Sequence, residues 1–357
     1  MTSGTVGEAW VMTAAGAPLE RREVVPRAPE PGEAVIQVAG CGVCHTDLSF
    51  LYDSVKTRRE PPLVLGHEIS GVVTGLGEGA DPALAGRAVI VPAVLPCGDC
   101  DLCRAGMRTI CRRQVMPGND RDGGFASHTL VPAKFLCPVP PALLDTHELW
   151  ELAVVSDAVS TPFQAVRRAE VGPGDLAVFV GTGGIGLHGV QIAAAIGAVV
   201  IALDISDTKL EQAASAGAAA TINAKGMPFR DLRNLVRTRA TDLGASPHRW
   251  KIFETSGTRA GQETAFGLLG FGATLSVVGF TSERIEVCLS HLMAFDAVAR
   301  GNWGADPLVY PELLEWLAAG RIRVKPFVER RPLDRINDVL EEAHRGALTR
   351  RVVLTPT

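Results

Sequence analysis

A glycine-rich turn between an apolar strand and an apolar helix is the feature that most constrains the fold. Leu176–Val180 is uninterrupted apolar sequence and leads into Gly181-Thr182-Gly183-Gly184-Ile185-Gly186, after which helix-forming apolar sequence continues to Ile196. In this context the first glycine permits the tight turn, the second lets a pyrophosphate approach the backbone, and the last lets helix and strand pack closely. The helix N-terminus presents unpaired N–H groups to phosphates. We expect a dinucleotide site built on Gly181, Gly183, Gly184, Ile185 and Gly186.

Asp204 indicates which dinucleotide is used. It follows the next apolar run, Val199–Leu203, where a carboxylate can accept hydrogen bonds from both ribose hydroxyls and repel a 2′-phosphate. Ile205 and Ser206 bring no cation for such a phosphate. NAD is therefore expected over NADP. Lys209 either reaches the ribose or lies solvated on its helix.

Alternating strand and helix patterns continue through the second half of the chain. They predict parallel strands with crossover helices, an α/β doubly wound (Rossmann) domain over residues 159–299. Val278 and Gly279, after one such strand, are candidate backbone contacts for the nicotinamide. Helical patterns cover 161–170, 185–196, 208–215, 227–239 and 264–269, and strand patterns cover 176–180, 199–203, the neighbourhood of Thr221, 251–254 and 274–278.

The first 155 or so residues have a different pattern from the second half of the chain. Short β-like runs at 34–38, 69–73, 88–91 and 126–131 are separated by Gly/Pro turns, which predicts a β-rich domain. The tail has helical patterns at 311–319 and 333–345 and a strand pattern at 351–354 that can pair back into this domain. We expect residues 1–158 and 300–357 to form one domain.

One segment resembles a membrane span. Leu176–Leu203 carries no charged residue, but it contains six glycines with His188 and Gln191. A buried strand, a turn and a buried helix explain this composition better.

Composition and charge exclude other classes. With 39 acidic residues against 35 Lys+Arg the net charge is -4, which provides no strong field for nucleic acid or an anionic membrane. Met1–Trp10 shows no signal-peptide pattern, so a cytoplasmic protein is expected.

Four of the eight cysteines form a compact run: Cys97, Cys100, Cys103 and Cys111. Two-residue gaps let a chain wrap its thiolates around one tetrahedral zinc ion, and a site with four protein ligands is structural rather than catalytic. The alternatives are a disulfide cluster, disfavoured without a secretory signal, and an iron–sulfur site, whose ferredoxin spacings differ.

A second set of metal-ligating residues is scattered. Cys41–Asp47, Gly66–Glu68 and Ser156–Ala158 each offer a ligand for a catalytic zinc, which needs three protein ligands and an open position. Sequence spacing alone cannot join them. Taken singly, such a Cys is usually core, and such a His or Asp lies at the surface or caps a helix.

Zinc-binding residues followed by a dinucleotide motif resemble the zinc-dependent medium-chain alcohol dehydrogenases over nearly the whole chain. This resemblance implies a GroES-like catalytic domain with two zinc ions, a Rossmann domain, an NAD-dependent dehydrogenase and a homodimer or homotetramer. By motif position it implies that Cys44, His67 and Asp157 bind the catalytic zinc, with Asp157 in place of the cysteine of liver-type members.

The same resemblance assigns further roles. Glu68 approaches the metal transiently, Asp47 orients His67, and Thr46 passes the proton outward. Ser49 stands where relatives place a relay histidine, which leaves the proton exit open. His45 stands where many relatives have a cation that binds the pyrophosphate, and a neutral histidine would make that contact weak. Arg351 is a further expected cofactor contact.

Four segments, 86–94, 115–120, 250–254 and 301–304, resemble more closely the subfamily that oxidises 6-hydroxycyclohex-1-ene-1-carbonyl-CoA; Thr255 departs from its pattern. This implies a cyclic allylic alcohol carried as a CoA thioester. Lys56, Arg58 and Arg59 can then meet the CoA phosphates, or simply form a solvated loop.

Three other functions remain open. The chain can be a general secondary alcohol dehydrogenase, a 1,4-reductase of a conjugated enoyl-CoA, or a non-catalytic nucleotide sensor on the same fold.

Overall fold

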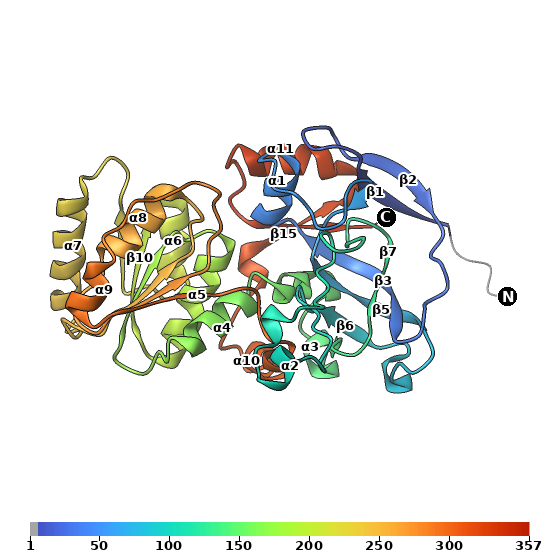
Figure 1. Ribbon diagram of the computed structural model, residues 1–357, viewed down its shortest axis with the longest axis horizontal. Helices are drawn as coiled ribbons and strands as arrows, with labels where there is room; N and C mark the ends of the chain where they lie inside the picture. The colour runs from blue at the N-terminus through green and yellow to red at the C-terminus, as the bar shows by residue number, and fades with distance from the viewer. Residues whose placement is uncertain (1–5, 357) are drawn as a thin grey trace. The chain divides into compact units, whose positions relative to one another are not determined.

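The computed structural model describes residues 6–356, which form two compact units (Figure 1). The first unit runs up to Ser160 and also contains Gly304–Ala319 and the chain from Arg323 onward; the second comprises Thr161–Trp303 and Gly320–Ile322. The expectation that Met1–Trp10 is no signal peptide falls partly outside the described residues.

The second unit contains the predicted Rossmann fold. Its six strands are all parallel, in the order β11-β10-β9-β12-β13-β14. The order reverses between β9 and β12, which is where such sheets bind ligands at their carboxyl ends. The strands are β9 (Leu176–Val180), β10 (Val199–Asp204), β11 (Ala220–Asn223), β12 (Lys251–Glu254), β13 (Thr274–Val277) and β14 (Val298–Gly301).

Apolar strands and crossover helices give this unit one core. Val178, Ile201 and Ile252 in adjacent strands are fully buried, as expected for a parallel sheet covered on both faces. The helices are α4 (Ser160–Arg168), α5 (Gly184–Ile196), α6 (Asp207–Ser215), α7 (Phe229–Asp242), α8 (Arg259–Gly267) and α9 (Ser290–Phe295).

The first unit is built on β-sheets, as predicted. One sheet has the order β15-β16-β3-β5-β6-β8 with β7 also pairing with β3, and a smaller sheet has the order β2-β1-β4. The strands are β1 (Gly7–Met12), β2 (Glu20–Val24), β3 (Glu33–Gly42), β4 (Leu63–Val64), β5 (Glu68–Leu76), β6 (Ala88–Val91), β7 (His128–Pro132), β8 (Cys137–Pro138), β15 (Val328–Pro332) and β16 (Arg351–Thr355).

Short helices complete this unit, and the tail returns to it. Val353 and Leu354 of β16 pair with Gly42 and Cys41 of β3, so the last strand lies beside the segment that carries Cys44. The α-helices are α1 (His45–Leu51), α2 (Asp101–Arg104), α3 (Pro141–Leu144), α10 (Tyr310–Ala318) and α11 (Ile336–His344); η3 (Leu149–Ser156) is a 3-10 helix.

Three details of the predicted elements are corrected. The strand expected at 126–131 is β7, which begins at His128. The helix expected at 264–269 is α8, which begins at Arg259 because Thr258 caps it, its hydroxyl accepting from the N–H of Gly261 at 3.0 Å. Helix α9 and strand β14 were not predicted.

The uncharged segment Leu176–Leu203 forms β9, α5 and most of β10, not a membrane span. Between residues 6 and 356, no helix has both the length and the apolar character needed to cross a bilayer.

Candidate functional site

The three scattered segments meet in the first unit. The sulfur of Cys44 lies 3.7 Å from Oδ2 of Asp157, and Nε2 of His67 lies 3.5 Å from the same oxygen. With Glu68 added, one ligand atom from each residue lies within 4.8 Å of all the others, and all four residues are buried. Zinc bonds of about 2.0–2.3 Å at tetrahedral angles separate neighbouring ligand atoms by about 3.3–3.8 Å. These residues can therefore hold one zinc ion.

Local structure brings each ligand to this point. Cys44 is the N-cap of α1, His67 directly precedes β5, and Asp157 follows η3. Gly66 has φ +94°, and a Cβ there would lie 2.7 Å from the sulfur of Cys41. Only glycine fits that turn, so Gly66 sets the direction of the chain at His67, just before β5.

Asp47 lies where it can orient two of these ligands. Its Oδ2 accepts the backbone N–H of Cys44 at 2.9 Å, and its Oδ1 accepts that of Gly66 at 3.1 Å. The same Oδ1 is 3.5 Å from Nδ1 of His67. Burial opposes charge on His67, but Asp47 and the Cys44 thiolate dominate and raise its pKa well above the usual range. Carboxylates that hold a metal-binding histidine in this way fix its tautomer and orientation.

Glu68 and Arg351 form a buried ion pair beside the ligand cluster. Nε of Arg351 donates to Oε2 of Glu68 at 3.1 Å, and a second guanidinium nitrogen donates to Oε1. Oε1 also accepts the backbone N–H of Ala158 at 3.2 Å. Burial raises the pKa of Glu68, although Arg351 opposes that shift. Both residues were expected near the site, but their mutual pairing was not; Arg351 was expected to contact the cofactor.

Helix α1 carries the remaining predicted catalytic residues. The hydroxyl of Thr46 accepts from the sulfur of Cys44 at 3.7 Å, which places it directly beside the cluster. Ser49 is buried one helical turn further along, and His45 is exposed.

A set of hydroxyl groups around Asp157 was missed by the sequence reasoning. The carbonyl of Ser156 accepts from the hydroxyl of Tyr310, from Oγ of Ser160 at 3.0 Å and from the N–H of Ala93 at 3.3 Å. Tyr310 is fully buried, and burial raises its pKa well above its usual value. These bonds fix the peptide that precedes Asp157. No sequence signal links Tyr310 to it, since the two lie far apart in the chain.

The four clustered cysteines form the second ligand set. Their sulfurs lie 3.4 Å apart for Cys97 and Cys111, 3.7 Å for Cys100 and Cys111, and 3.9 Å for Cys97 and Cys103. These separations suit four thiolates on one zinc ion, and all eight cysteines are free thiols. The disulfide alternative is therefore not what the structure shows.

The thiols of this cluster differ in acidity. A hydrogen bond from the backbone of Cys103 lowers the pKa of Cys100 to about 6, whereas burial raises that of Cys103 to about 12. Four thiolates this close repel one another, so full ionisation needs a cation among them.

The glycine turn has the geometry that its sequence predicts. Gly181 has φ +91°, and a Cβ there would lie 2.5 Å from Cα of Ser256. A Cβ on Gly186 would lie 2.0 Å from the carbonyl oxygen of Gly181, so helix α5 packs tightly on the turn. At Gly183, which precedes the helical residues Gly184 and Ile185, a Cβ would meet nothing within 4 Å, which leaves the backbone open to a ligand.

Asp204 at the end of β10 is tied to this turn. Oδ2 of Asp204 accepts hydrogen bonds from the N–H of Thr182 at 2.7 Å and from the hydroxyl of Thr182 at 3.0 Å. Oδ1 of Asp204 accepts from the N–H groups of Ile205 and Ser206. Lys209 is half-buried on α6.

The structure restricts which atoms of the predicted nicotinamide contacts can bind a cofactor. The N–H groups of Val278 and Gly279 both donate to the carbonyl of Glu254, at 2.9 and 3.0 Å. These amides are therefore used within the fold, and only their carbonyls stay candidates for the cofactor.

Comparison with known proteins identifies the family. Residues 30–141 match the alcohol dehydrogenase GroES-like domain, and residues 184–319 match the zinc-binding dehydrogenase domain. The chain is 31% identical to an alcohol dehydrogenase of Geobacillus stearothermophilus over 94% of its own length and 96% of the relative's. This chain belongs to the medium-chain zinc-dependent alcohol dehydrogenase family.

Solved structures of other alcohol dehydrogenases and reductases agree. The alcohol dehydrogenase of Aeropyrum pernix is 29% identical, with a TM-score of 0.87 over 98% of this chain and 100% of the other. An acetophenone reductase of Geotrichum candidum, solved in complex with NAD, is 26% identical, with a TM-score of 0.85 over 98% of this chain and 97% of the other. The protein is thus an oxidoreductase of the zinc and NAD type, and the non-catalytic alternative is set aside.

In this alcohol dehydrogenase the basic segment expected to meet CoA is largely neutralised. Arg58 pairs with Asp120 at 2.8 Å and Arg59 with Asp122 at 2.9 Å, while Lys56 is exposed. Both arginines are exposed and can exchange partners, but their charge is already compensated. The segment gives no independent support to a CoA site.

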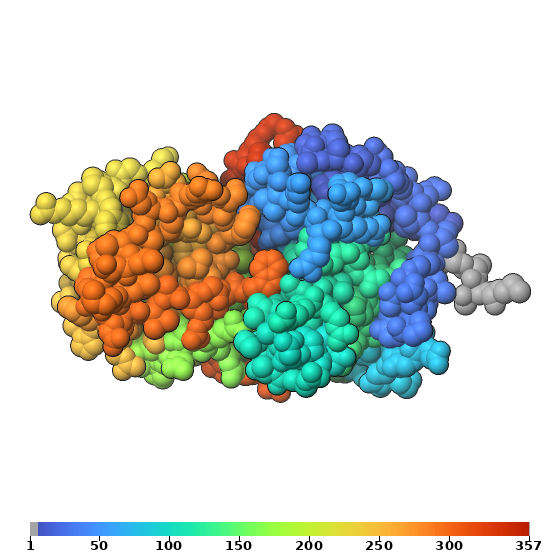
Figure 2. All heavy atoms as spheres, viewed as in Figure 1, coloured from blue at the N-terminus to red at the C-terminus, as the bar shows by residue number. Residues whose placement is uncertain are grey.

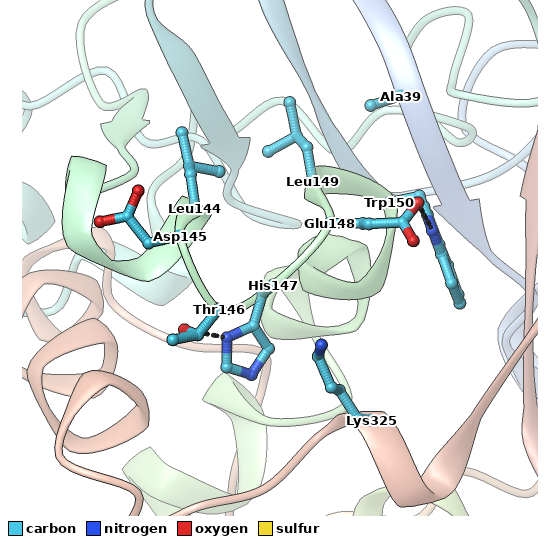
Figure 3. Close-up of a pocket in the computed structure, with 9 residues that line it drawn as sticks. All are labelled: Ala39, Leu144, Asp145, Thr146, His147, Glu148, Leu149, Trp150 and Lys325. Carbon is cyan, nitrogen blue, oxygen red and sulfur yellow. Dashed lines mark hydrogen bonds between the residues drawn. The ribbon is translucent and has the colours of Figure 1, made fainter.

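A surface pocket in the first unit of this alcohol dehydrogenase is lined by none of the residues of the two ligand clusters. Its volume is about 580 Å³, and its wall includes His147, Trp150 and Lys325 (Figure 3). Thr146 and Glu148 hold His147 and Trp150 by hydrogen bonds, and no predicted site residue lines the pocket. This pocket is therefore not the candidate metal site.

Proposed function

We propose that this chain oxidises a secondary alcohol to a ketone with NAD, at a zinc ion held by Cys44, His67 and Asp157. The observation that supports it most is the convergence of these buried side chains from three distant segments at separations that suit one zinc ion. We further propose that the unit carrying them is the catalytic domain and that the four-cysteine cluster holds a second, structural zinc.

Zinc in such a site supplies Lewis-acid chemistry that lowers the pKa of an alcohol hydroxyl, and NAD accepts the hydride. The chain supplies the rest. Asp47 holds the orientations of Cys44 and His67, while the bonds to Ser156 hold Asp157. We propose that Thr46, which lies beside the cluster, takes the proton from the hydroxyl and passes it outward.

Glu68 is the residue best placed to exchange with a ligand. Its carboxylate lies in the cluster yet is held by Arg351 and by the N–H of Ala158. Movement of Glu68 toward a bound metal would break that ion pair, so we propose that Arg351 acts on the metal site through Glu68.

NAD is proposed over NADP because of Asp204. A carboxylate at the end of β10, next to the glycine turn, binds ribose hydroxyls and repels a 2′-phosphate. Asp204→Ala should reduce the preference for NAD over NADP, measured as the ratio of kcat/KM, by removing that repulsion.

The natural substrate is the finer part of the proposal. The close likeness of four segments to a cyclic acyl-CoA dehydrogenase subfamily supports a cyclic allylic alcohol carried on CoA. The compensated charges of Arg58 and Arg59 favour instead a general secondary alcohol dehydrogenase. Reduction of a conjugated C=C bond is less well supported, since it does not need the zinc ligands.

One assay separates these possibilities. NAD reduction is followed with a cyclic 6-hydroxy-1-enoyl-CoA, with its free acid and with cyclohexanol, and each is repeated with NADP. A kcat/KM at least about tenfold higher for the thioester supports the CoA proposal. Equal turnover of the free acid or cyclohexanol supports the general dehydrogenase. Turnover of none of the three contradicts the proposed reaction.

We also propose a homodimer or homotetramer. Strand β14 ends the parallel sheet, all four of its residues are exposed, and nearby Leu289 and Met293 are 68% and 77% exposed. The orange part of the chain in Figure 2, which includes α9, lies at the surface of this unit. An exposed strand edge with apolar side chains is a template for pairing with a second copy. Light scattering measures the subunit number directly.

A further inference from the structure

Asn302 is a buried amide without a partner. It follows β14 in the segment Gly301–Gly304, and its backbone N–H donates to the carbonyl of Val277 at 2.9 Å. Asn302 is only 8% exposed, yet neither Oδ1 nor Nδ2 of its side chain has a hydrogen-bond partner within residues 6–356. Nearly all buried polar side-chain atoms in folded proteins are paired, so this amide calls for a ligand that pairs with it.

The position of Asn302 in the sheet indicates which ligand. The glycine turn and Asp204 lie at the carboxyl ends of β9 and β10, which take the adenosine half of a dinucleotide. The cofactor crosses the point where the strand order reverses, so the carboxyl ends of β12, β13 and β14 take the nicotinamide half. Asn302 lies directly at that edge.

Another unpartnered atom at this edge is less informative. Oε2 of the fully buried Glu254 has no partner within residues 6–356, but its Oε1 accepts from Ser256 and Gly257. Glu254 therefore already serves to hold the loop after β12. Asn302 differs because both of its polar atoms are unpaired.

We propose that the side chain of Asn302 hydrogen-bonds the carboxamide of the nicotinamide ring, which rests on the proposed use of NAD. Two primary amides complement each other, because each offers N–H donors and a carbonyl acceptor. Pairing satisfies both atoms of Asn302 and fixes the rotation of the carboxamide. Asn302 is then a cofactor-binding residue, one that holds the ring at a defined orientation for hydride transfer.

The test compares three ligands on the whole enzyme. Binding of NADH, of the reduced 3-acetylpyridine analogue and of ADP-ribose is measured by calorimetry for the wild type and for Asn302→Leu. The analogue keeps the ring carbonyl but lacks the N–H donors, and ADP-ribose lacks the ring. We expect the substitution to lower the affinity for NADH by about tenfold or more. The affinity for the analogue should fall by about threefold or less, and that for ADP-ribose by less than about twofold.

Thermal unfolding without cofactor provides the second measurement. Leucine has the same number and branching of side-chain heavy atoms as asparagine and brings no polar atom, so the Tm of the variant should equal or exceed that of the wild type. A lower Tm with equal weakening of all three ligands would show a purely structural role and overturn the proposal, as would unchanged affinity for NADH. If the wild type itself bound neither NADH nor ADP-ribose, the use of NAD would be wrong instead.

Discussion

The two ligand clusters of the first unit have separations that suit one zinc ion each, but they are assembled in opposite ways. Cys97, Cys100, Cys103 and Cys111 come from one short segment, and its turns alone bring their sulfurs together. Cys44, His67 and Asp157 come from three segments, and the whole sheet is needed to bring them together. A cluster made locally can be recognised from spacing; a cluster made by tertiary structure can be recognised only from the fold.

This contrast also predicts different consequences of damage. The local cluster stabilises the segment that forms it, whereas the assembled cluster lies on a scaffold that other interactions already hold, such as the pairing of β3 with β5 and β16. Loss of a ligand should therefore reduce stability in the first cluster and activity in the second.

The largest expected effect is on activity. In Asp157→Ala, one zinc ion per chain should be lost and kcat/KM should fall by about a thousandfold or more, because the Lewis acid contributes several kcal/mol to the transition state. The Tm of the apoprotein should change little. Metal analysis and steady-state kinetics measure the first two, and retention of both metals with a normal rate would show that Asp157 is no ligand.

The next effect is on stability. Cys103→Ser should remove the other zinc ion and lower the apparent Tm by roughly 10 °C, since structural zinc contributes several kcal/mol to folding. Enzyme kept below the new Tm should retain most of its kcat. A complete loss of activity at low temperature, with the fold still intact by circular dichroism, would erase the distinction between the two clusters.

The smallest expected effect is on stability, at an ion pair that belongs to neither cluster and serves as a comparison for both. Glu33 in β3 pairs with Arg27 at 2.8 Å and with Arg121 at 2.6 Å. Burial alone would raise its pKa, but the two arginines outweigh it and lower the pKa to about 2. A carboxylate with a lowered pKa stabilises the fold above its unfolded value of about 4.3, and this contribution is lost as the pH falls toward 2.

Glu33→Gln should therefore lower stability by about 2–3 kcal/mol at neutral pH. The difference in Tm from the wild type should be constant between pH 8 and pH 5 and shrink below about pH 4.5, with zinc content and kcat unchanged at pH 7. A difference that grew on acidification would contradict the sign of the pKa shift.

Sequence alone predicted what local sequence determines. The glycine turn, Asp204 at the end of β10 and the four-cysteine run are each set by neighbouring residues, and the structure shows their expected geometry. Strand β14 was missed because Val298–Gly301 is exposed and has no buried pattern. Helix α8 was misplaced because its start depends on the cap at Thr258 rather than on apolar spacing.

Contacts between distant residues could not be predicted in this way. Arg351 and Glu68 were both named as site residues, but nothing in the sequence indicates that they form an ion pair. The bond from Tyr310 to the carbonyl of Ser156 likewise depends on the folded position of α10. The predicted CoA contacts of Arg58 and Arg59 failed to anticipate that nearby acids compensate their charges, since those acids lie more than 60 residues away in the sequence.

The return of the tail to the first unit has a consequence for biosynthesis. Tyr310, Arg351 and β16 are translated after nearly all of the second unit, yet they complete the surroundings of Asp157 and Glu68. As the ribosome delivers the chain from its N-terminus, the six-stranded sheet can close first, whereas the zinc site stays without its last supports until the final residues emerge. A nascent or truncated chain that ends before β16 can therefore complete its parallel sheet before Cys44, His67 and Asp157 gain these supports.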